Sequence, residues 1–346
     1  MGKVKGRSTV YNSITSQEKL EQVNPDNLDL ENDFLEYLEA TDKAGTTITQ
    51  YRNNLHIIWC WGLENNKNKP FVEYTKREIT KFQNHAVNIW GWSPRRVRVV
   101  KATARSLENY IENVLDDEFP DYRAIWNKIE APVNEAVREK SVFTMADLQP
   151  LLDQLVKDEK YMRACILALA MYSGRRKAEL CRFKVHYFDK KNLICGGALY
   201  KTPEKMKTKG RGSRGKLLDV YTLAKPFQPY FDLWMEERKK LGIESEWLFP
   251  DSANPEAHIK ESMINSMYKW FSKFLGKPFY AHAMRHAFVT NLSRQGLPDS
   301  VIKDVCGWSN LEMVAVYSDI DTSETLDMYF DENGIKAHEA KSLNDL

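Results

Sequence analysis

Four side chains in the last quarter of the chain could act together on a phosphodiester: His282, Arg285, Trp308 and Tyr317. His282 and Arg285 are three positions apart, so on a helix they would share one face. Tyr317 follows Trp308 by nine positions, across an expected turn and into a further helix. An imidazole, a guanidinium, an indole N–H and a phenol suit phosphodiester chemistry. The remaining chain must then supply further cations, a proton donor and a surface that binds a polyanion.

The 346 residues are enough for two domains with their own cores. Fifty Lys and Arg nearly balance 48 Asp and Glu, so the net charge of +2 says nothing about nucleic acid. The distribution of charge is more informative, because Lys201–Lys216 holds seven cations and one acid. Such a local basic patch is typical of a protein that binds phosphate in one place.

Several classes of protein are disfavoured by composition. No apolar run reaches the roughly 18 residues of a membrane-spanning helix, and the N-terminus lacks the apolar region of a secretory signal. The five cysteines form no CxxC pair, which favours reduced thiols in a cytosolic protein. No motif for a metal or a nucleotide is present. We therefore expect a cytoplasmic protein that needs no cofactor, no metal and no membrane.

Hydrophobic periodicity predicts a mainly α (α+β) chain: helices throughout, with a small antiparallel sheet of strands at 193–194, 198–200 and 217–223. Near Gly174, an apolar helix at 161–172 is expected to stop. The expected organisation is a flexible N-terminal arm (1–27), a helical domain (28–118), a linker (119–142), a second domain (143–330) and a C-terminal tail (331–346).

One helix of the first domain carries a basic stripe. Ser93 and Pro94 predict its start, as N-cap and first helical residue. One face is apolar and the opposite face basic; the expected DNA-binding residues on the basic face are Arg95, Arg98, Lys101 and Arg105. The pattern fits a helix that faces a DNA duplex, and equally a solvated charged face.

Three sequence boxes resemble those of the tyrosine recombinase or phage integrase family. Ser-Gly-Arg-Arg-Lys-Ala-Glu-Leu at 173–180 is similar to its first arginine box, and His-Ala-Met-Arg-His at 282–286 to its HxxRH box. Gly307-Trp308 with the later Tyr317 is similar to its nucleophile box. A basic strand-turn-strand lies between the boxes, as in the family. The resemblance covers most of the chain and implies a helical DNA-clamping domain followed by a catalytic domain.

The resemblance implies that Tyr317 attacks DNA, forms a 3′-phosphotyrosyl link and releases a 5′-hydroxyl, without ATP because the bond energy is stored. Arg176 and Arg285 would donate to the non-bridging oxygens of the transition state. His282 would accept the phenolic proton. Glu179 would orient a neighbouring cation or histidine. Trp308, where many members have histidine, can donate its N–H but cannot titrate.

A lysine of the hairpin would protonate the leaving oxygen; Lys209 fits the family pattern best, and Lys207 is the rival. Further DNA contacts are expected from Lys207, Arg211 and Arg214. His286 and Tyr329 are interpreted as structural. Arg175 and Lys177 depart from the family, in which these positions are usually apolar.

The implied partner is a double-stranded DNA recombination site, bound by a homotetramer because two duplexes exchange four strands. The C-terminal segment with Leu326 and Tyr329 could dock on a neighbouring subunit. An integrase of a phage or mobile genetic element is the expected function. One alternative is a DNA-binding regulator that lost the reaction, although a binder has no need of a phenol. The other is a type IB topoisomerase-like enzyme, against which the helical domain and the length argue.

Overall fold

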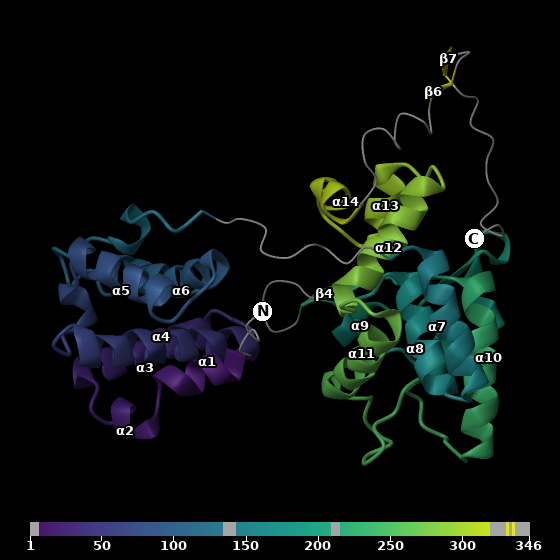
Figure 1. Cartoon of the computed structure of the whole chain (residues 1–346), viewed down its shortest axis with the longest axis horizontal. Coiled ribbons are helices and arrows are strands. Elements are labelled where there is room, and N and C mark those ends of the chain that lie inside the picture. Colours follow the sequence, from purple (N-terminus) through teal and green to yellow (C-terminus); the bar gives the residue numbers. More distant parts are fainter. Residues whose placement is uncertain (1–6, 134–142, 209–214, 319–329, 332–333, 336–346) are drawn as a thin grey trace. The chain divides into compact units, whose positions relative to one another are not determined.

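The computed structural model describes residues 7–133, 143–208, 215–318, 330–331 and 334–335. The described residues form two compact units, one made mainly of residues 7–133 and the other of residues 143–208, 216–318, 330–331 and 334–335. Helices dominate both units, and the described strands form small antiparallel sheets (Figure 1). The predicted fold class is confirmed.

The first unit is a bundle of helices around an aromatic core. Trp59 and Trp61 of α4 are buried in it, together with Phe34 of α3 and Phe82 of α5. Its helices are α1 (Arg7–Ile14), α2 (Gln17–Leu20), α3 (Pro25–Ala40), α4 (Gly45–Asn65), α5 (Lys76–Asn88) and α6 (Pro94–Val114), with short 3-10 turns at Phe71–Glu73 and Trp126–Lys128.

The first unit extends beyond the limits expected from sequence at both ends. The described part of the expected arm forms α1 and α2 and buries Ile14 and Val23, so it is not a flexible arm. At the other end, the buried carboxylate of Glu108 accepts hydrogen bonds from the backbone N–H groups of Ile125 and Trp126. Part of the expected linker therefore packs into this unit, because it buries an indole and satisfies its backbone there.

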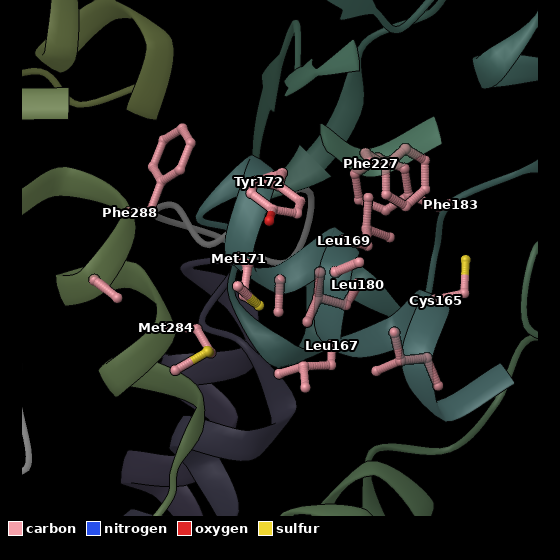
Figure 2. Packing of buried hydrophobic residues seen from close by; sticks show 14 of the residues in the cluster. Cys165, Leu167, Leu169, Met171, Tyr172, Leu180, Phe183, Phe227, Met284 and Phe288 are labelled. Carbon is pink, nitrogen blue, oxygen red and sulfur yellow. The ribbon is translucent and has the colours of Figure 1, made fainter. Parts of the chain in front are cut away.

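The second unit is built around α8. Ten consecutive residues of this helix, Ala164–Ser173, are buried. Figure 2 shows Met284 and Phe288 approaching them on one side and Phe227 on the other. Its helices are α7 (Met145–Lys157), α8 (Tyr161–Ser173), α9 (Lys177–Leu180), α10 (Ala224–Lys240), α11 (Glu261–Leu275), α12 (Ala281–Arg294), α13 (Asp299–Cys306) and α14 (Glu312–Tyr317), with 3-10 turns at Val185–Phe188, Lys190–Asn192 and Cys195–Gly197.

The second unit also contains short strands: β1 (Leu193–Ile194), β2 (Leu199–Lys201), β3 (Met206–Thr208), β4 (Lys216–Leu218), β5 (Tyr221–Leu223), β6 (Phe330–Asp331) and β7 (Gly334–Ile335). The antiparallel order is β1-β2-β5 in one sheet, and β3 pairs with β4 in another, with Lys207 opposite Leu217. The single strand expected at 217–223 is thus two strands in two sheets. The break falls at Val220. Its carbonyl oxygen accepts a hydrogen bond from the backbone N–H of Thr202, and its own N–H donates to the Thr202 hydroxyl oxygen.

Candidate active site

The turn between α8 and α9 places the first pair of arginines. Gly174 ends α8 in the left-handed region, at a φ of 58°, and a Cβ there would lie 2.3 Å from Cδ1 of Phe288. Glycine is therefore required both by the backbone and by the space. The turn directs Arg175 into the interior and makes Arg176 the residue that precedes α9. The helix stop predicted at Gly174 is confirmed.

Glu179 holds Arg176 in place. Its carboxylate, 2% exposed, accepts a hydrogen bond from the backbone N–H of Arg176 at 3.2 Å. It also accepts one from Nη1 of the same arginine at 3.1 Å, while the Arg176 side chain stays 29% exposed. A carboxylate bound in this way restricts the guanidinium to one orientation with an open side. The structure thus places Glu179 where the sequence expected a supporting residue.

Arg285 follows His282 by about one turn along α12. Whereas His282 is exposed at the start of the helix, Arg285 is fully buried. The Arg285 guanidinium donates to the carbonyl oxygens of Gly174, at 3.0 Å, and Cys306, at 3.1 Å. Burial lowers the pKa of Arg285 to about 10. This arginine therefore joins the first arginine turn to the end of α13.

Tyr317, at the end of α14, contacts both histidines of α12. Its hydroxyl lies 3.4 Å from Nδ1 of His282, and its carbonyl oxygen lies 3.1 Å from Nδ1 of His286. The Tyr317 ring centroid is 5.5 Å from the Arg285 guanidinium carbon. Trp308, in the turn after α13, stacks against Tyr317. The structure therefore brings together His282, Arg285, Trp308 and Tyr317. The Arg285 guanidinium faces the rings of both Trp308 and Tyr317.

The charge of this side-chain cluster is positive. Arg175 and Arg285 are buried, Arg176 is 29% exposed, and Glu179 is the one carboxylate among the buried residues described next to them. A site with an excess of cation favours an anion, because the anion recovers part of the desolvation cost. Its chemistry fits a phosphate group.

The hairpin of β3 and β4 is described only at its base. Lys207 is exposed on β3, and its backbone carbonyl accepts a hydrogen bond from Nη1 of Arg182 at 3.0 Å. Thr208 closes the base by donating to the carbonyl of Lys216. The predicted residues Lys209, Arg211 and Arg214 lie outside the described residues, and so does Tyr329.

The basic stripe on α6 is partly as predicted. Ser93 caps the helix by accepting from the N–H of Arg96. Arg95, Arg98 and Arg105 are exposed.

The placement of Lys101 on this exposed stripe is wrong, because it is 7% exposed. Its ammonium donates hydrogen bonds to Oε1 of Gln83, at 3.0 Å, and to the carbonyl oxygen of Ile129. Burial lowers the pKa of Lys101. These distant partners make it a structural cation of the first unit.

No sequence pattern indicated the burial of Arg175. This residue, noted only as a departure from the family, is buried and shares the Cys306 carbonyl with Arg285. Its burial depends on a contact between distant segments, which the sequence pattern does not reveal. His286 has a structural contact, as predicted, because its Nδ1 lies 3.1 Å from the carbonyl oxygen of Tyr317. Within the described ranges, no cluster of three His, Cys, Asp or Glu side chains could bind a metal ion. A search of the same ranges for a helix able to cross a membrane finds none.

Comparison with known proteins identifies the family and agrees with the fold. The model of the phage integrase family matches residues 141–324, more than half of the chain. The SPbeta prophage-derived recombinase-like protein YomM of Bacillus subtilis is 29% identical over 280 residues, which cover 79% of this chain and 80% of the relative. The tyrosine recombinase XerA of Pyrococcus horikoshii is 24% identical over 313 residues, or 88% and 93%.

Among solved structures, the XerH site-specific recombinase bound to its palindromic difH substrate has a similar fold. Its TM-score is 0.65 at 16% identity, with 92% of this chain and 90% of that chain covered. The chain belongs to the phage integrase family. It is a tyrosine-type site-specific recombinase, an enzyme of DNA recombination.

Proposed function

We propose that this chain cuts and rejoins duplex DNA through a covalent 3′-phosphotyrosyl intermediate on Tyr317, and that it serves as an integrase of a mobile element. The observation that carries the proposal is the position of the Tyr317 side chain, whose hydroxyl lies 3.4 Å from Nδ1 of His282 and whose ring centroid lies 5.5 Å from the buried guanidinium carbon of Arg285. A nucleophile, a proton acceptor and a cation for the phosphate are thereby adjacent.

In the cleavage step, the Tyr317 oxygen forms a bond to phosphorus and its proton passes to His282. The bond from phosphorus to the 5′ oxygen breaks, and a lysine of the hairpin protonates that oxygen, Lys209 in preference to Lys207. Rejoining is the reverse, since a 5′-hydroxyl attacks the phosphotyrosine. His282 is exposed and 3.4 Å from the phenol, a separation that can shorten when substrate binds.

Charge stabilisation would come from Arg176 and Arg285. The transition state adds negative charge to the non-bridging oxygens, and a forked guanidinium can donate two hydrogen bonds to them. Arg285 is now covered by the rings of Trp308 and Tyr317. The Tyr317 ring must therefore move away from Arg285 as the phosphate enters, which couples DNA binding to exposure of the nucleophile.

The grip on the duplex would be divided between the two units. The first unit would clamp DNA through the exposed Arg95, Arg98 and Arg105 of α6. The second would add Lys207, Arg211 and Arg214 from the hairpin. We further propose that four protomers act on two duplexes in the cytoplasm, because each supplies one tyrosine for four exchanged strands, and that the C-terminal segment docks on a neighbouring subunit.

The test is a nicked suicide substrate, in which the short fragment after the cut diffuses away and traps the adduct. The wild type should give a protein–DNA band that resists SDS, and Tyr317→Phe should bind the same DNA without forming it. If the wild type binds DNA but forms no adduct, the chain would be a DNA-binding regulator and not a recombinase. Relaxation of a supercoiled plasmid that lacks any special site would instead favour a topoisomerase-like activity.

A further inference from the structure

Arg175 is a buried arginine at a position that the reaction as proposed does not use. It is 1% exposed, although it directly precedes the part-exposed Arg176. Its Nη2 donates to the carbonyl of Val305, and its Nη1 lies 3.5 Å from the carbonyl oxygen of Cys306. The guanidinium therefore binds the last carbonyls of α13, at the negative end of that helix.

The same carbonyl joins Arg175 to Arg285. The carbonyl oxygen of Cys306 also accepts a hydrogen bond from Nη2 of Arg285, at 3.1 Å. In return, Nη1 of Arg285 donates to the carbonyl of Gly174, the residue before Arg175. The two guanidiniums and two backbone segments thus form a closed set of hydrogen bonds, which we call the arginine clamp (Arg175, Arg285, Gly174, Val305 and Cys306).

The arginine clamp lies under the turn that carries Trp308. Gly307 ends α13 with a φ of 69°, and a Cβ on it would meet Cδ1 of Leu218 at 2.5 Å and Nη1 of Arg175 at 3.8 Å. The turn is thus packed between β4 and the Arg175 guanidinium. Arg175 thus bonds the carbonyls of Val305 and Cys306, which lead directly into Gly307 and Trp308, and it shares the Cys306 carbonyl with Arg285.

Stability alone gives no reason for an arginine here. A buried cation loses its hydration, and a protein that carries an apolar residue of similar volume in its place is often as stable or more stable. Burial lowers the pKa of Arg175, as expected when the charged form is disfavoured. The pocket already carries Arg176 and Arg285, so a third positive charge adds repulsion that an incoming phosphate would relieve.

We propose that Arg175 is a positioning residue, which holds the end of α13 so that Arg285 and Trp308 meet the scissile phosphate in the correct geometry. The inference rests on the proposed phosphotyrosyl chemistry. It predicts that loss of Arg175 slows the chemical step more than it weakens DNA binding.

The experiment compares Arg175→Leu with a matched control, Arg238→Leu. Arg238 is 2% exposed in the same unit and also donates to backbone carbonyls, those of Ser245, Trp247 and Leu248, but none of its partners belongs to the pocket. Single-turnover cleavage of the suicide substrate at saturating protein measures the chemical step, a gel shift measures affinity, and thermal melting measures the structural cost of each change.

We expect Arg175→Leu to cleave roughly 100-fold more slowly, because small displacements of catalytic groups cost about that much. Its affinity for DNA should stay within about threefold of the wild type. Arg238→Leu should cleave at nearly the wild-type rate once folded, whatever its melting temperature. Arg175→Lys, which keeps the charge but not the fork, should be intermediate. Equal cleavage by Arg175→Leu and the control would overturn the proposal, and if the Leu variant does not fold, a wild-type rate for Arg175→Lys overturns it.

A readout without catalysis separates this proposal from the function on which it rests. The Cys306 thiol is 2% exposed, so alkylation followed by peptide mass spectrometry reports opening of the arginine clamp. Labelling of Cys306 should be faster in Arg175→Leu than in the wild type or in Arg238→Leu, and equal labelling in all three would count against the clamp. Absence of any wild-type adduct would sink the proposed function, whereas normal wild-type cleavage with an unaffected Leu variant sinks only the role of Arg175.

Discussion

The indole of Trp308 stacks on the ring of Tyr317, with the two centroids 5.1 Å apart and the planes inclined by 26°. The indole N–H is buried and has no hydrogen-bond partner among the residues that the structure describes. Buried donors are normally paired, so this donor is suited to a group that arrives with the substrate. The Arg285 guanidinium carbon lies 4.8 Å from the indole centroid, so in the proposed reaction both groups would bind the same phosphate.

Replacement of Trp308 separates stacking from hydrogen bonding. Trp308→Phe keeps a ring against Tyr317 but removes the N–H, so we expect single-turnover cleavage to slow by roughly 100-fold with little change in melting temperature. Trp308→His restores a donor that titrates, so its rate should fall as the imidazole loses its proton. If Trp308→Phe cleaves as fast as the wild type, the indole N–H has no role in cleavage and Trp308 contributes only packing.

The two histidines of α12 should fail in different ways. His282 faces the Tyr317 hydroxyl and His286 its backbone carbonyl. His282→Ala should slow cleavage by about 100-fold or more, and added imidazole should restore part of the rate, because a free base can take the proton. His286→Ala should slow cleavage through misplacement of the tyrosine, and imidazole should not restore it. Rescue of both variants, or of neither, would contradict these roles.

The sequence predicted the fold well at positions where interactions between neighbouring residues determine the backbone. Gly174 stops α8 because only glycine fits its backbone and its space, and Ser93 caps α6 by bonding a nearby N–H. The recombinase boxes likewise placed Tyr317, His282 and Arg285 in one pocket before any coordinates. Motifs that carry their own geometry are readable from sequence.

Contacts between distant segments could not be read in the same way. Lys101 looked exposed by helical spacing, but its partners Gln83 and the Ile129 carbonyl come from other parts of the first unit. Arg175 looked like a mismatch, yet its partners lie some 130 positions away, at Val305 and Cys306. A charged residue is buried only where such partners exist, and periodicity does not reveal them.

The α6 stripe gives a salt-dependent prediction. Arg95→Gln, Arg98→Gln and Arg105→Gln should each weaken DNA binding and reduce the slope of log affinity against log salt by about 1, as expected for the loss of one phosphate contact. Lys101→Met is the internal control: its side chain is buried, so it should leave the slope unchanged and alter only the melting temperature. Unchanged slopes in all three arginine variants would remove α6 from the duplex interface.

The start of α7 should make stability depend on pH. Thr144 donates its backbone N–H to the Asp147 carboxylate and accepts from the N–H of Asp147, and these bonds lower the pKa of Asp147. A carboxyl whose pKa is depressed by folding stabilises the fold above its unfolded value of 3.8 and loses that contribution as pH falls through the folded pKa.

At pH 7, Asp147→Ala should therefore lower the free energy of unfolding by roughly 0.5–1 kcal/mol, the usual worth of an acid in a first helical turn. The difference from the wild type should shrink below pH 3.8, measured by denaturant melts across pH. Thr144→Ala removes the hydroxyl that accepts from the N–H of Asp147 but keeps the backbone N–H that donates to the carboxylate. Any departure of the double variant from the sum of the two single losses therefore measures the coupling between these two bonds. A constant difference at every pH would rule out the carboxylate.

The choice between the two hairpin lysines can be decided by the leaving group. A substrate with sulfur in place of the 5′ oxygen releases a thiolate, which needs no proton donor at neutral pH. The general acid should therefore be the lysine whose loss slows cleavage of ordinary DNA, by about 100-fold or more, but not of the sulfur substrate.

We expect this pattern for Lys209→Met. Lys207 is exposed on β3, with its backbone tied to Arg182 and its strand neighbours Met206 and Thr208 buried. Lys207→Met should therefore lose affinity for DNA and slow both substrates alike. The reverse pattern would assign the proton to Lys207. If both variants cleave ordinary DNA at the wild-type rate, the hairpin does not supply the acid, and the proton must come from another group of the pocket or from water.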